Sequence, residues 1–485
     1  MTQQPPIHVC VTNLLESRHQ KKTGIPRVEY EIAKFLAARG ATVIAWRGRR
    51  FHHVDFAEVI DSIARAQSLD LDTICAEPQL SRPPAALQRM LAGICIALAR
   101  HVPVNSEPGR TIVHAAFRRV AAVWPHLSPA RRRAMAQRLR LTDDSDRLGH
   151  FTDVLARMRG SELTDNAARG PVEFARGGVV LLLGIWWNQR PLDEIARLRR
   201  ERGLRFIAMV HDLIPIRRPE FFTDETGRLR FSRFIDGLLA SADALFATSA
   251  HVAHGVEAYA RERRVAIQPV ARVPLCSDLR RSVMPQHTAA LARHALEPGR
   301  FVVYVSTINP RKNHLFAYRL WRRLVEELGN AAPTLVFAGQ RGWRYEALLE
   351  TMTADTLMWN RKLRFVEGPT DAEVAWLYAN CAFSIFPSLY EGWGLPILES
   401  LSFGKYCLAA DNTSLPEAGQ GLVFHAGAED EDAWLAELRR VLGEPGYLEA
   451  ANARIRERFI ARDWDAVGAD LLAVIASAKA AGEPA

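Results

Sequence analysis

The sequence predicts an α/β protein with two doubly wound domains, each a mostly parallel sheet covered by helices. Apolar runs of strand length, such as 7–11 and 301–306, alternate with segments whose apolar residues recur at helical spacing. The chain has 485 residues, more than a single hydrophobic core usually holds. A polar, proline-containing stretch at 273–299 separates two such series and is typical of a linker between domains.

The first series opens with a strand–helix–strand unit. We expect a buried strand at 7–11, a polar loop at 13–22, a helix at 28–39 ended by Gly40, and a second strand at 41–46. Such a unit implies parallel strands joined by a right-handed crossover.

Residues 50–170 interrupt this rhythm. They are rich in alanine and arginine, and their pattern is mostly helical, so we expect a helical insertion in the first domain. Strands are expected again at 178–187, 205–210 and 244–249.

The second series repeats the alternation. Helices are expected at 315–328, 372–379 and over much of 430–485, and strands at 301–306, 334–338, 363–366, 383–386, 406–409 and 421–424. These elements predict a first domain at 1–275, a second at 276–460 and a C-terminal helical segment at 461–485.

Composition narrows the class of partner. With 48% hydrophobic and 24% charged residues, the chain is of the ordinary globular kind. Much of its net charge of +9 lies in 110–140, where Phe117 and Trp124 stand among arginines. This region suits either a membrane surface or the solvated face of a core helix. Without a zinc-finger or RNA-binding signature, nucleic acid is disfavoured as a partner.

Cysteine usage and hydropathy bear on location. The six cysteines are far apart and form no Cys-X-X-Cys pair, which favours reduced thiols over disulfides or a zinc site. The N-terminus has no secretory pattern, and the apolar run 179–187 is too short to span a bilayer as a helix. We therefore expect a cytoplasmic protein.

The most informative segment is 388–399, which reads Ser-Leu-Tyr-Glu-Gly-Trp-Gly-Leu-Pro-Ile-Leu-Glu. Glu391 and Glu399 flank a Gly-X-Gly turn between an expected strand and a helix that Pro396 can begin. The N–H groups of a helix N-terminus bind anions. Carboxylates beside them would repel a phosphate and so are better placed to hold hydroxyls. Phosphate and hydroxyl groups together indicate a nucleotide sugar.

Other polar residues follow expected strands, at the edge where doubly wound sheets bind ligands. Lys312 could reach a diphosphate, His211 could bond a reacting sugar or help a proton move, and Gly24 could let backbone approach a ligand. A solvated lysine and a structural histidine are the alternatives. Four Asp-X-Asp pairs follow no convincing strand, which disfavours a metal–diphosphate site. The turn at 392–394 is only the start of a GxGxxG, since Ile397 stands at the third position, and Walker A and HExxH motifs are absent. A dehydrogenase and an NTPase are therefore disfavoured.

These motifs resemble those of the GT-B glycosyltransferases of group 1, glycosyltransferase family four. The similarity covers most of 178–460 and the first 45 residues, but not 50–170. The matching pieces are 23–27, 211–215, 307–313, 337–339, 388–399 and 412–417. The resemblance implies two Rossmann-like domains facing across a cleft, with the nucleotide mainly on the second and the last helix crossing back to the first.

The resemblance also implies roles for single residues. Glu391 would contact the donor sugar, Glu399 the ribose, Lys312 the diphosphate, and His211 would lie beside the reacting centre. Many members carry an arginine where this chain has Ser306, and Arg311 is the candidate replacement. Catalytic roles fall to Glu391, Lys312 and His211, and donor binding to Gly24, Arg311, Asn313, Gly392, Trp393, Gly394, Leu395 and Glu399.

The implied activity is retaining transfer of a hexose from a nucleotide sugar to a glycan or lipid-linked glycan of a bacterial surface polysaccharide. Subfamily resemblance favours GDP-mannose as the donor substrate, with no metal and no other cofactor. Peripheral contact with the inner face of the cytoplasmic membrane is expected. A catalytically silent sugar-nucleotide-binding scaffold and a GT-B epimerase or phosphorylase remain alternatives.

Overall fold

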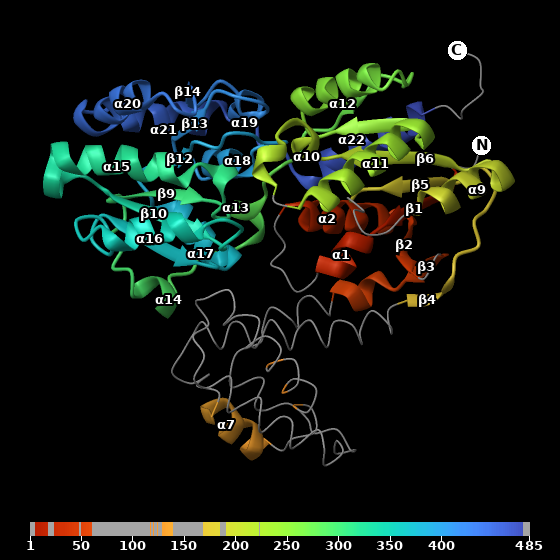
Figure 1. Ribbon diagram of the computed structural model, residues 1–485, viewed down its shortest axis with the longest axis horizontal. Helices are drawn as coiled ribbons and strands as arrows, with labels where there is room; N and C mark the ends of the chain where they lie inside the picture. Colours follow the sequence, from red (N-terminus) through yellow and green to blue (C-terminus); the bar gives the residue numbers. More distant parts are fainter. Residues whose placement is uncertain are drawn as a thin grey trace. The chain divides into compact units, whose positions relative to one another are not determined.

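The computed structural model describes residues 5–17, 24–47, 50–60, 129–138, 168–184, 191–222 and 224–478, with Phe117, Val120 and Trp124 in addition. The chain divides into two compact units, Pro6–Phe174 and Ala175–Ala485, the first five residues counting with the latter. Figure 1 labels the elements of both units.

The smaller unit holds a mixed sheet in the order β4-β3-β2-β1. β1 and β2 are parallel, whereas β3 pairs antiparallel with β2 and with β4. Its elements are β1 (Ile7–Cys10), α1 (Thr12–Ser17), α2 (Ile25–Ala37), β2 (Thr42–Arg47), β3 (Arg50–Val54), α7 (Pro129–Arg138) and β4 (Ala168–Pro171).

The expected loop at 13–22 is wrong in its first part, because α1 is a helix. Its residues Leu14 and Leu15 are buried, and the Leu14 N–H donates to the Glu29 carboxylate over 2.5 Å. Helix α2 begins at Ile25, before the expected start, since Pro26 suits a first helical turn.

The segment expected to be a helical insertion carries strands at both ends, β3 and β4, with α7 between them. Most of the rest lies outside the described residues. Phe117 and Trp124 are completely buried, so these two aromatic rings belong to a core and not to a membrane-facing surface. Arg132 is buried as well, and its Nε donates to the Trp124 carbonyl over 3.0 Å.

The larger unit contains the parallel strand series β5-β6-β7-β8. β5 and β6 are almost entirely buried, which explains their uninterrupted apolar sequences. The elements are β5 (Val179–Leu182), α9 (Leu192–Arg202), β6 (Arg205–Val210), α10 (Ile214–Arg217), η2 (Pro219–Phe221), α11 (Glu225–Ser241), β7 (Ala244–Ala247), α12 (Ala250–Glu262) and β8 (Ala271–Arg272).

The same unit contains a six-stranded parallel sheet in the order β11-β10-β9-β12-β13-β14. The chain starts at β9, winds outward to β11, then returns to β12 and winds the other way. The order therefore reverses between β9 and β12, the arrangement of a doubly wound fold. The strands are β9 (Phe301–Val305), β10 (Thr334–Gly339), β11 (Leu363–Glu367), β12 (Ser384–Phe386), β13 (Cys407–Ala410) and β14 (Phe424–Ala426).

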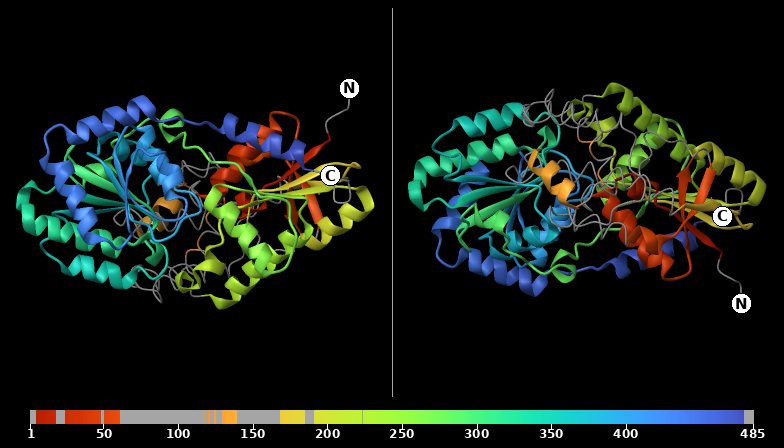
Figure 2. Two further views of the ribbon diagram at one scale, coloured as in Figure 1. Left: turned by 90° about the horizontal axis from the view of Figure 1, so that it is seen from above. Right: turned by 90° about the horizontal axis from the view of Figure 1, so that it is seen from below.

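Helices cover both faces of this sheet (Figure 1 and Figure 2). Side chains of β9 alternate between two cores: Val302 and Tyr304 pack with α15 and α20, while Phe301 and Val303 pack with α13 and α17. The helices are α13 (Leu279–Ser282), α14 (Ala289–Ala292), η3 (Pro310–Lys312), α15 (His314–Leu328), η4 (Gly329–Ala331), α16 (Glu346–Ala354), α17 (Asp371–Asn380), α18 (Leu395–Ser402), α19 (Leu415–Gly419), α20 (Glu431–Gly443), α21 (Tyr447–Arg458) and α22 (Trp464–Ser477).

Two expectations in this unit need correction. The stretch 273–299 is not only a linker, because α13 and α14 form there and bury Leu279 and Leu291 in the core. Strand β14 begins at Phe424, later than expected, because Gln420 and Gly421 adopt positive φ after α19 and turn the chain first.

The last helix, α22, lies against the β5–β8 series. Arg205 at the start of β6 donates from Nη1 to the carbonyls of Ile475 and Ala478 over 3.2 and 2.7 Å. Among the helices of the described residues, none is long and apolar enough to cross a membrane.

Candidate functional site

The site lies where the order of the β9–β14 sheet reverses. The loops after β9 and β12 leave the carboxyl ends of neighbouring strands, and ligands of doubly wound sheets bind at this position. The Leu389 N–H donates to the Arg311 carbonyl over 2.9 Å, so the two loops are tied through their backbones.

Local structure fixes Lys312 in the loop after β9. The Asn309 side chain accepts the Lys312 N–H over 3.2 Å and caps η3, while the Tyr304 hydroxyl donates to the Lys312 carbonyl. Asn313 has φ 57° and reverses the chain into α15. The lysine side chain runs past the Phe386 ring, with Nζ 5.0 Å from its centroid.

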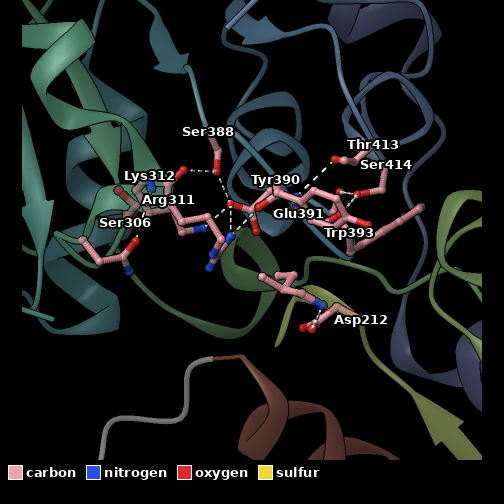
Figure 3. Close-up of polar contacts among 12 residues, drawn as sticks. Asp212, Ser306, Arg311, Lys312, Ser388, Tyr390, Glu391, Trp393, Thr413 and Ser414 are labelled. Atoms are coloured by element: carbon pink, nitrogen blue, oxygen red, sulfur yellow. Dashed lines mark hydrogen bonds and ion pairs between the residues drawn. The ribbon is translucent and has the colours of Figure 1, made fainter. Parts of the chain in front are cut away.

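Glu391 collects three donors on one oxygen, as Figure 3 shows. Oε1 accepts Lys312 Nζ, Arg311 Nη1 at 2.8 Å and Ser388 Oγ at 2.5 Å. The residue is only 8% exposed. Within the described part of the chain, Oε2 receives no hydrogen bond.

The charges in this cluster depend on one another. Burial by itself would raise the pKa of Glu391, but Arg311 and Lys312, with the Ser388 hydrogen bond, lower it to about 2. Burial lowers the pKa of Lys312 to about 8, against the pull of Glu391. Burial acts against the charge of Arg311 too, yet the Glu391 and Asp212 carboxylates raise its pKa. At neutral pH two cations therefore share the Glu391 carboxylate, and the Asp212 side chain lies within electrostatic reach of both.

Arg311 and Ser306 differ in what they contact. Arg311 Nη1 also donates to the Tyr390 carbonyl over 2.5 Å, so this guanidinium belongs to the cluster. The Ser306 hydroxyl instead lies 3.1 Å from His314 Nε2. Many members of the family carry an arginine at the position of Ser306. That Arg311 takes over the role of this arginine stays a prediction.

Hydroxyl groups hold the turn after Glu391 (Figure 3). The Glu391 N–H donates to Thr413 Oγ1 over 3.1 Å. Ser414 Oγ lies 3.1 Å from the Glu391 carbonyl and 2.6 Å from the Trp393 carbonyl. Within the described residues, the N–H groups of Gly392, Trp393, Gly394 and Leu395 have no hydrogen-bond acceptor. The start of α18 therefore presents free donors of the kind that bind anions.

Gly392 lies against the end of β6. A Cβ added to it would be 2.2 Å from the His211 carbonyl oxygen and 3.1 Å from the Asp212 Cβ, so only glycine fits. This contact brings the backbone of the predicted His211 to the Glu391 turn. Burial raises the pKa of Asp212, whose carboxylate accepts the Ile214 N–H over 2.9 Å.

The His211 side chain is engaged elsewhere. It is 7% exposed, and its Nε2 lies 2.5 Å from the Leu183 carbonyl, to which it donates. Burial lowers the pKa of His211 to about 4, so the ring is neutral at pH 7. This is the backbone pairing of a structural histidine, and contact with a reacting sugar stays a prediction.

Three other predicted residues have surroundings of their own. Glu399 of α18 interacts with the Tyr378 hydroxyl, whose pKa burial and this carboxylate raise. Asn313 Nδ2 donates to the Ala428 carbonyl over 2.8 Å. Gly24 belongs to the smaller unit, where it has φ 62° directly before α2. Their contacts with a donor stay predictions.

Several residues of the site were not predicted from the sequence. Ser388 stands inside the conspicuous motif, and the 412–417 piece contains Thr413 and Ser414, so both lay within recognised segments. Thr248 and Ser249 follow the carboxyl end of β7. Because doubly wound sheets bind ligands at the carboxyl ends of their strands, this position could have indicated both residues. Within the described ranges, no group of three or more His, Cys, Asp or Glu side chains could hold a metal ion.

The part of the chain that contains the β9–β14 sheet matches a known protein family. Residues 290–458 match the family model of glycosyl transferases group 1. This part of the chain therefore resembles a group 1 glycosyltransferase domain. The match contains Lys312 and the whole 388–399 segment, whereas His211 and Gly24 fall outside it. The resemblance stated from the sequence is thereby confirmed.

Curated relatives match only part of this chain. The serotype-specific mannosyltransferase WbdA of Escherichia coli is 32% identical over 241 residues, which are 47% of this chain and 29% of that protein. O-antigen chain mannosyltransferase B of Escherichia coli is 33% identical over 165 residues, 34% of this chain and 42% of that protein. The chain thus spans less than half the length of these two relatives.

Solved structures share the fold over nearly the whole chain. HepE of Anabaena, solved with UDP and glucose, has a TM-score of 0.53 at 12% identity and covers 98% of this chain and 100% of its own. Sucrose-phosphate synthase of Thermosynechococcus elongatus has a TM-score of 0.53 at 14% identity and covers 98% of each chain. The predicted GT-B fold is confirmed.

Proposed function

We propose that this protein transfers a hexose from a nucleotide sugar to a glycan or lipid-linked glycan, with retention at the anomeric carbon and without a metal. The observation that carries the proposal is the cluster of Lys312, Arg311 and Glu391 at the reversal of strand order, inside a group 1 glycosyltransferase domain. Polysaccharide biosynthesis at the bacterial surface is the proposed context, because both curated relatives described above are mannosyltransferases and one is named for the O-antigen chain.

The charges of the cluster suit a diphosphate. Lys312 and Arg311 converge on a single carboxylate oxygen, so two cationic side chains lie next to each other. A bound diphosphate would draw Lys312 and Arg311 toward its own oxygens, and the free N–H groups of Gly392–Leu395 would add neutral donors. Glu391 would keep its charge, since its pKa is about 2, and its open Oε2 would accept hydroxyls of the sugar.

The reaction needs no strong base on the protein. The bond between the anomeric carbon and the diphosphate oxygen breaks, and Lys312 and Arg311 stabilise the charge that develops on the leaving group. The acceptor oxygen bonds the anomeric carbon from the same face, and its proton passes to the departing phosphate. His211, neutral and bonded to the Leu183 carbonyl, would contribute through position and not through charge.

The names of the matched relatives favour mannose, and hence GDP-mannose, as the donor substrate. A lipid-linked acceptor would bring the protein to the inner face of the cytoplasmic membrane, which is part of the proposal.

The test is transfer by the purified full chain. GDP-mannose, UDP-glucose, ADP-glucose and dTDP-rhamnose would be screened by thermal shift and then for product. Lys312→Met should lower turnover by about 100-fold or more, the cost of losing a charged group aimed at the leaving oxygens. Lys362→Met is the matched control, because Lys362 directly precedes β11, at the opposite end of the sheet, and bonds the Asn330 and Ala332 carbonyls.

The outcomes separate the alternatives. Turnover by the wild type and by Lys362→Met, with loss in Lys312→Met, supports the proposal. Near-normal turnover in Lys312→Met contradicts the assigned role. Nucleotide-sugar binding without any product would indicate the scaffold alternative.

A further inference from the structure

Residues of the β5–β8 series hold the turn that follows Glu391. Thr248 Oγ1 and Ser249 Oγ donate to the Gly392 carbonyl over 2.9 and 3.0 Å. Both residues follow β7 and are almost completely buried, with 2% and 0% exposure. Two buried side chains thus donate to one backbone carbonyl, which restrains the turn more firmly than a single hydrogen bond would.

A second contact joins the start of α12 to α19. The Glu417 carboxylate of α19 accepts the Ala250 and His251 N–H groups over 2.9 and 3.0 Å, at the start of α12. Ser249 caps that helix, accepting the Val252 N–H over 3.1 Å. A carboxylate at a helix N-terminus is stabilised by the helix dipole. The β7–α12 turn is thus fixed against the segment that carries Ser414.

The carbonyls of three consecutive residues are then held by hydroxyls. Ser414 holds those of Glu391 and Trp393, and Thr248 and Ser249 hold that of Gly392. In a trans peptide the N–H points opposite to the preceding carbonyl, and the described residues contain no cis bond. The N–H groups of Gly392, Trp393 and Gly394 are therefore turned away from these hydroxyls.

The orientation of the Trp393 N–H depends on residues that lie outside the region matched by the family model. Its peptide unit is oriented by the Gly392 carbonyl, whose donors come from Thr248 and Ser249, outside 290–458. Without them the peptide could rotate and lose the direction of its free N–H. Preorganised donors that need no reorientation are the ones that stabilise charge best.

We infer that Thr248 and Ser249 are positioning residues for the donor: they fix the Gly392–Trp393 peptide so that its N–H faces the bound nucleotide sugar. The inference rests on the proposed function. Donor binding would then depend on residues of the β5–β8 series as well as on the matched region 290–458.

The test compares Thr248→Val, which removes the hydroxyl at nearly constant volume, with Thr248→Ser, which keeps it. Ser241→Ala is the control, because the Ser241 hydroxyl also bonds a carbonyl, that of Gly237 over 2.6 Å, but on α11. Two quantities are measured on the full chain. The first is amide hydrogen exchange, without ligand, of Leu389 and Glu391, whose N–H groups are hydrogen-bonded. The second is the Kd of GDP-mannose by calorimetry.

We expect Thr248→Val to speed exchange of the Leu389 and Glu391 amides and to raise the Kd about ten-fold, the upper end of the effect of one lost hydrogen bond. Thr248→Ser should stay within about two-fold of the wild type, as should Ser241→Ala.

Exchange and affinity in Thr248→Val equal to those of Ser241→Ala, with a wild type that binds and turns over donor, would overturn the inference alone. A wild type that neither binds nor turns over any nucleotide sugar would refute the proposed function, and the role of Thr248 in donor binding with it. In that case exchange still reports whether Thr248 holds the turn.

Discussion

Replacing Glu391 by glutamine tests whether this carboxylate neutralises the buried cations. The substitution keeps the size of the side chain and one acceptor oxygen but removes the charge that Lys312 and Arg311 share. The cluster is buried, with side-chain exposures of 11% for Glu391, 13% for Lys312 and 15% for Arg311. Solvent therefore screens the loss poorly, and we expect a large effect on stability.

The magnitude follows from the pKa of Glu391. A change from 4.5 to about 2 on folding corresponds to about 3 kcal/mol of stabilisation at pH 7. Because the folded pKa lies below the unfolded one, this stabilisation is complete above the unfolded pKa and is lost as the pH falls toward the folded value. The difference between wild type and Glu391→Gln should therefore be about 3 kcal/mol at pH 7 and about half of that near pH 3.

The assay is urea unfolding between pH 3 and pH 7, followed by tryptophan fluorescence. The core of the β9–β14 sheet contains the fully buried Trp321 and Trp434, which report on it directly. Glu350→Gln is the matched control, because Glu350 is exposed on α16 and should change stability by less than about 0.5 kcal/mol. If Glu391→Gln is as stable as Glu350→Gln across this range, Glu391 does not carry the charge that balances the cluster.

Three further outcomes are expected. Gly392→Ala should abolish transfer, because its Cβ would lie 2.2 Å from the His211 carbonyl oxygen. Gly443→Ala is the control and should leave transfer unchanged, because a Cβ there would meet nothing within 4 Å. Equal activities of the two variants would contradict the close packing at Gly392. The kcat/KM for the donor should fall as the pH rises through about 8, since burial lowers the pKa of Lys312 to that value and only its cation binds a diphosphate. Lys312→Arg should shift the fall to higher pH, and an unchanged profile would exclude this lysine. Thr370→Ala should cost about 1 kcal/mol in urea unfolding without changing turnover, because Thr370 caps α17 in a reciprocal capping box.

Local sequence patterns were sufficient for most strands and helices of the β9–β14 sheet. Its buried strands are short uninterrupted apolar runs, and helix α15 carries its apolar residues on one face. The pattern failed where a tertiary contact decides the structure. Leu14 and Leu15 make α1 helical because they enter a core, and the polar residues around them conceal this in the sequence.

The residues of the site likewise fall into those that local sequence predicts and those that depend on tertiary contacts. The 388–399 segment identified the class of protein, because its residues are neighbours in sequence as well as in space. Contacts across long sequence separations could not be predicted, such as those from Thr248 and Ser249 to Gly392. Hydroxyls at a strand end look alike in the sequence whether they cap a helix, face solvent or hold another loop.

The sequence by itself determined the α/β fold class, the resemblance to group 1 glycosyltransferases and the choice of Lys312 and Glu391 as a candidate pair, because each depends on local spacing and residue type. Only the tertiary structure decided that the two residues meet on one carboxylate oxygen, with Arg311 and Ser388. It also decided that the His211 ring is neutral and bonded to backbone. The physical reason is that charge balance, burial and the direction of a peptide N–H are set by neighbours that folding brings together from distant parts of the chain.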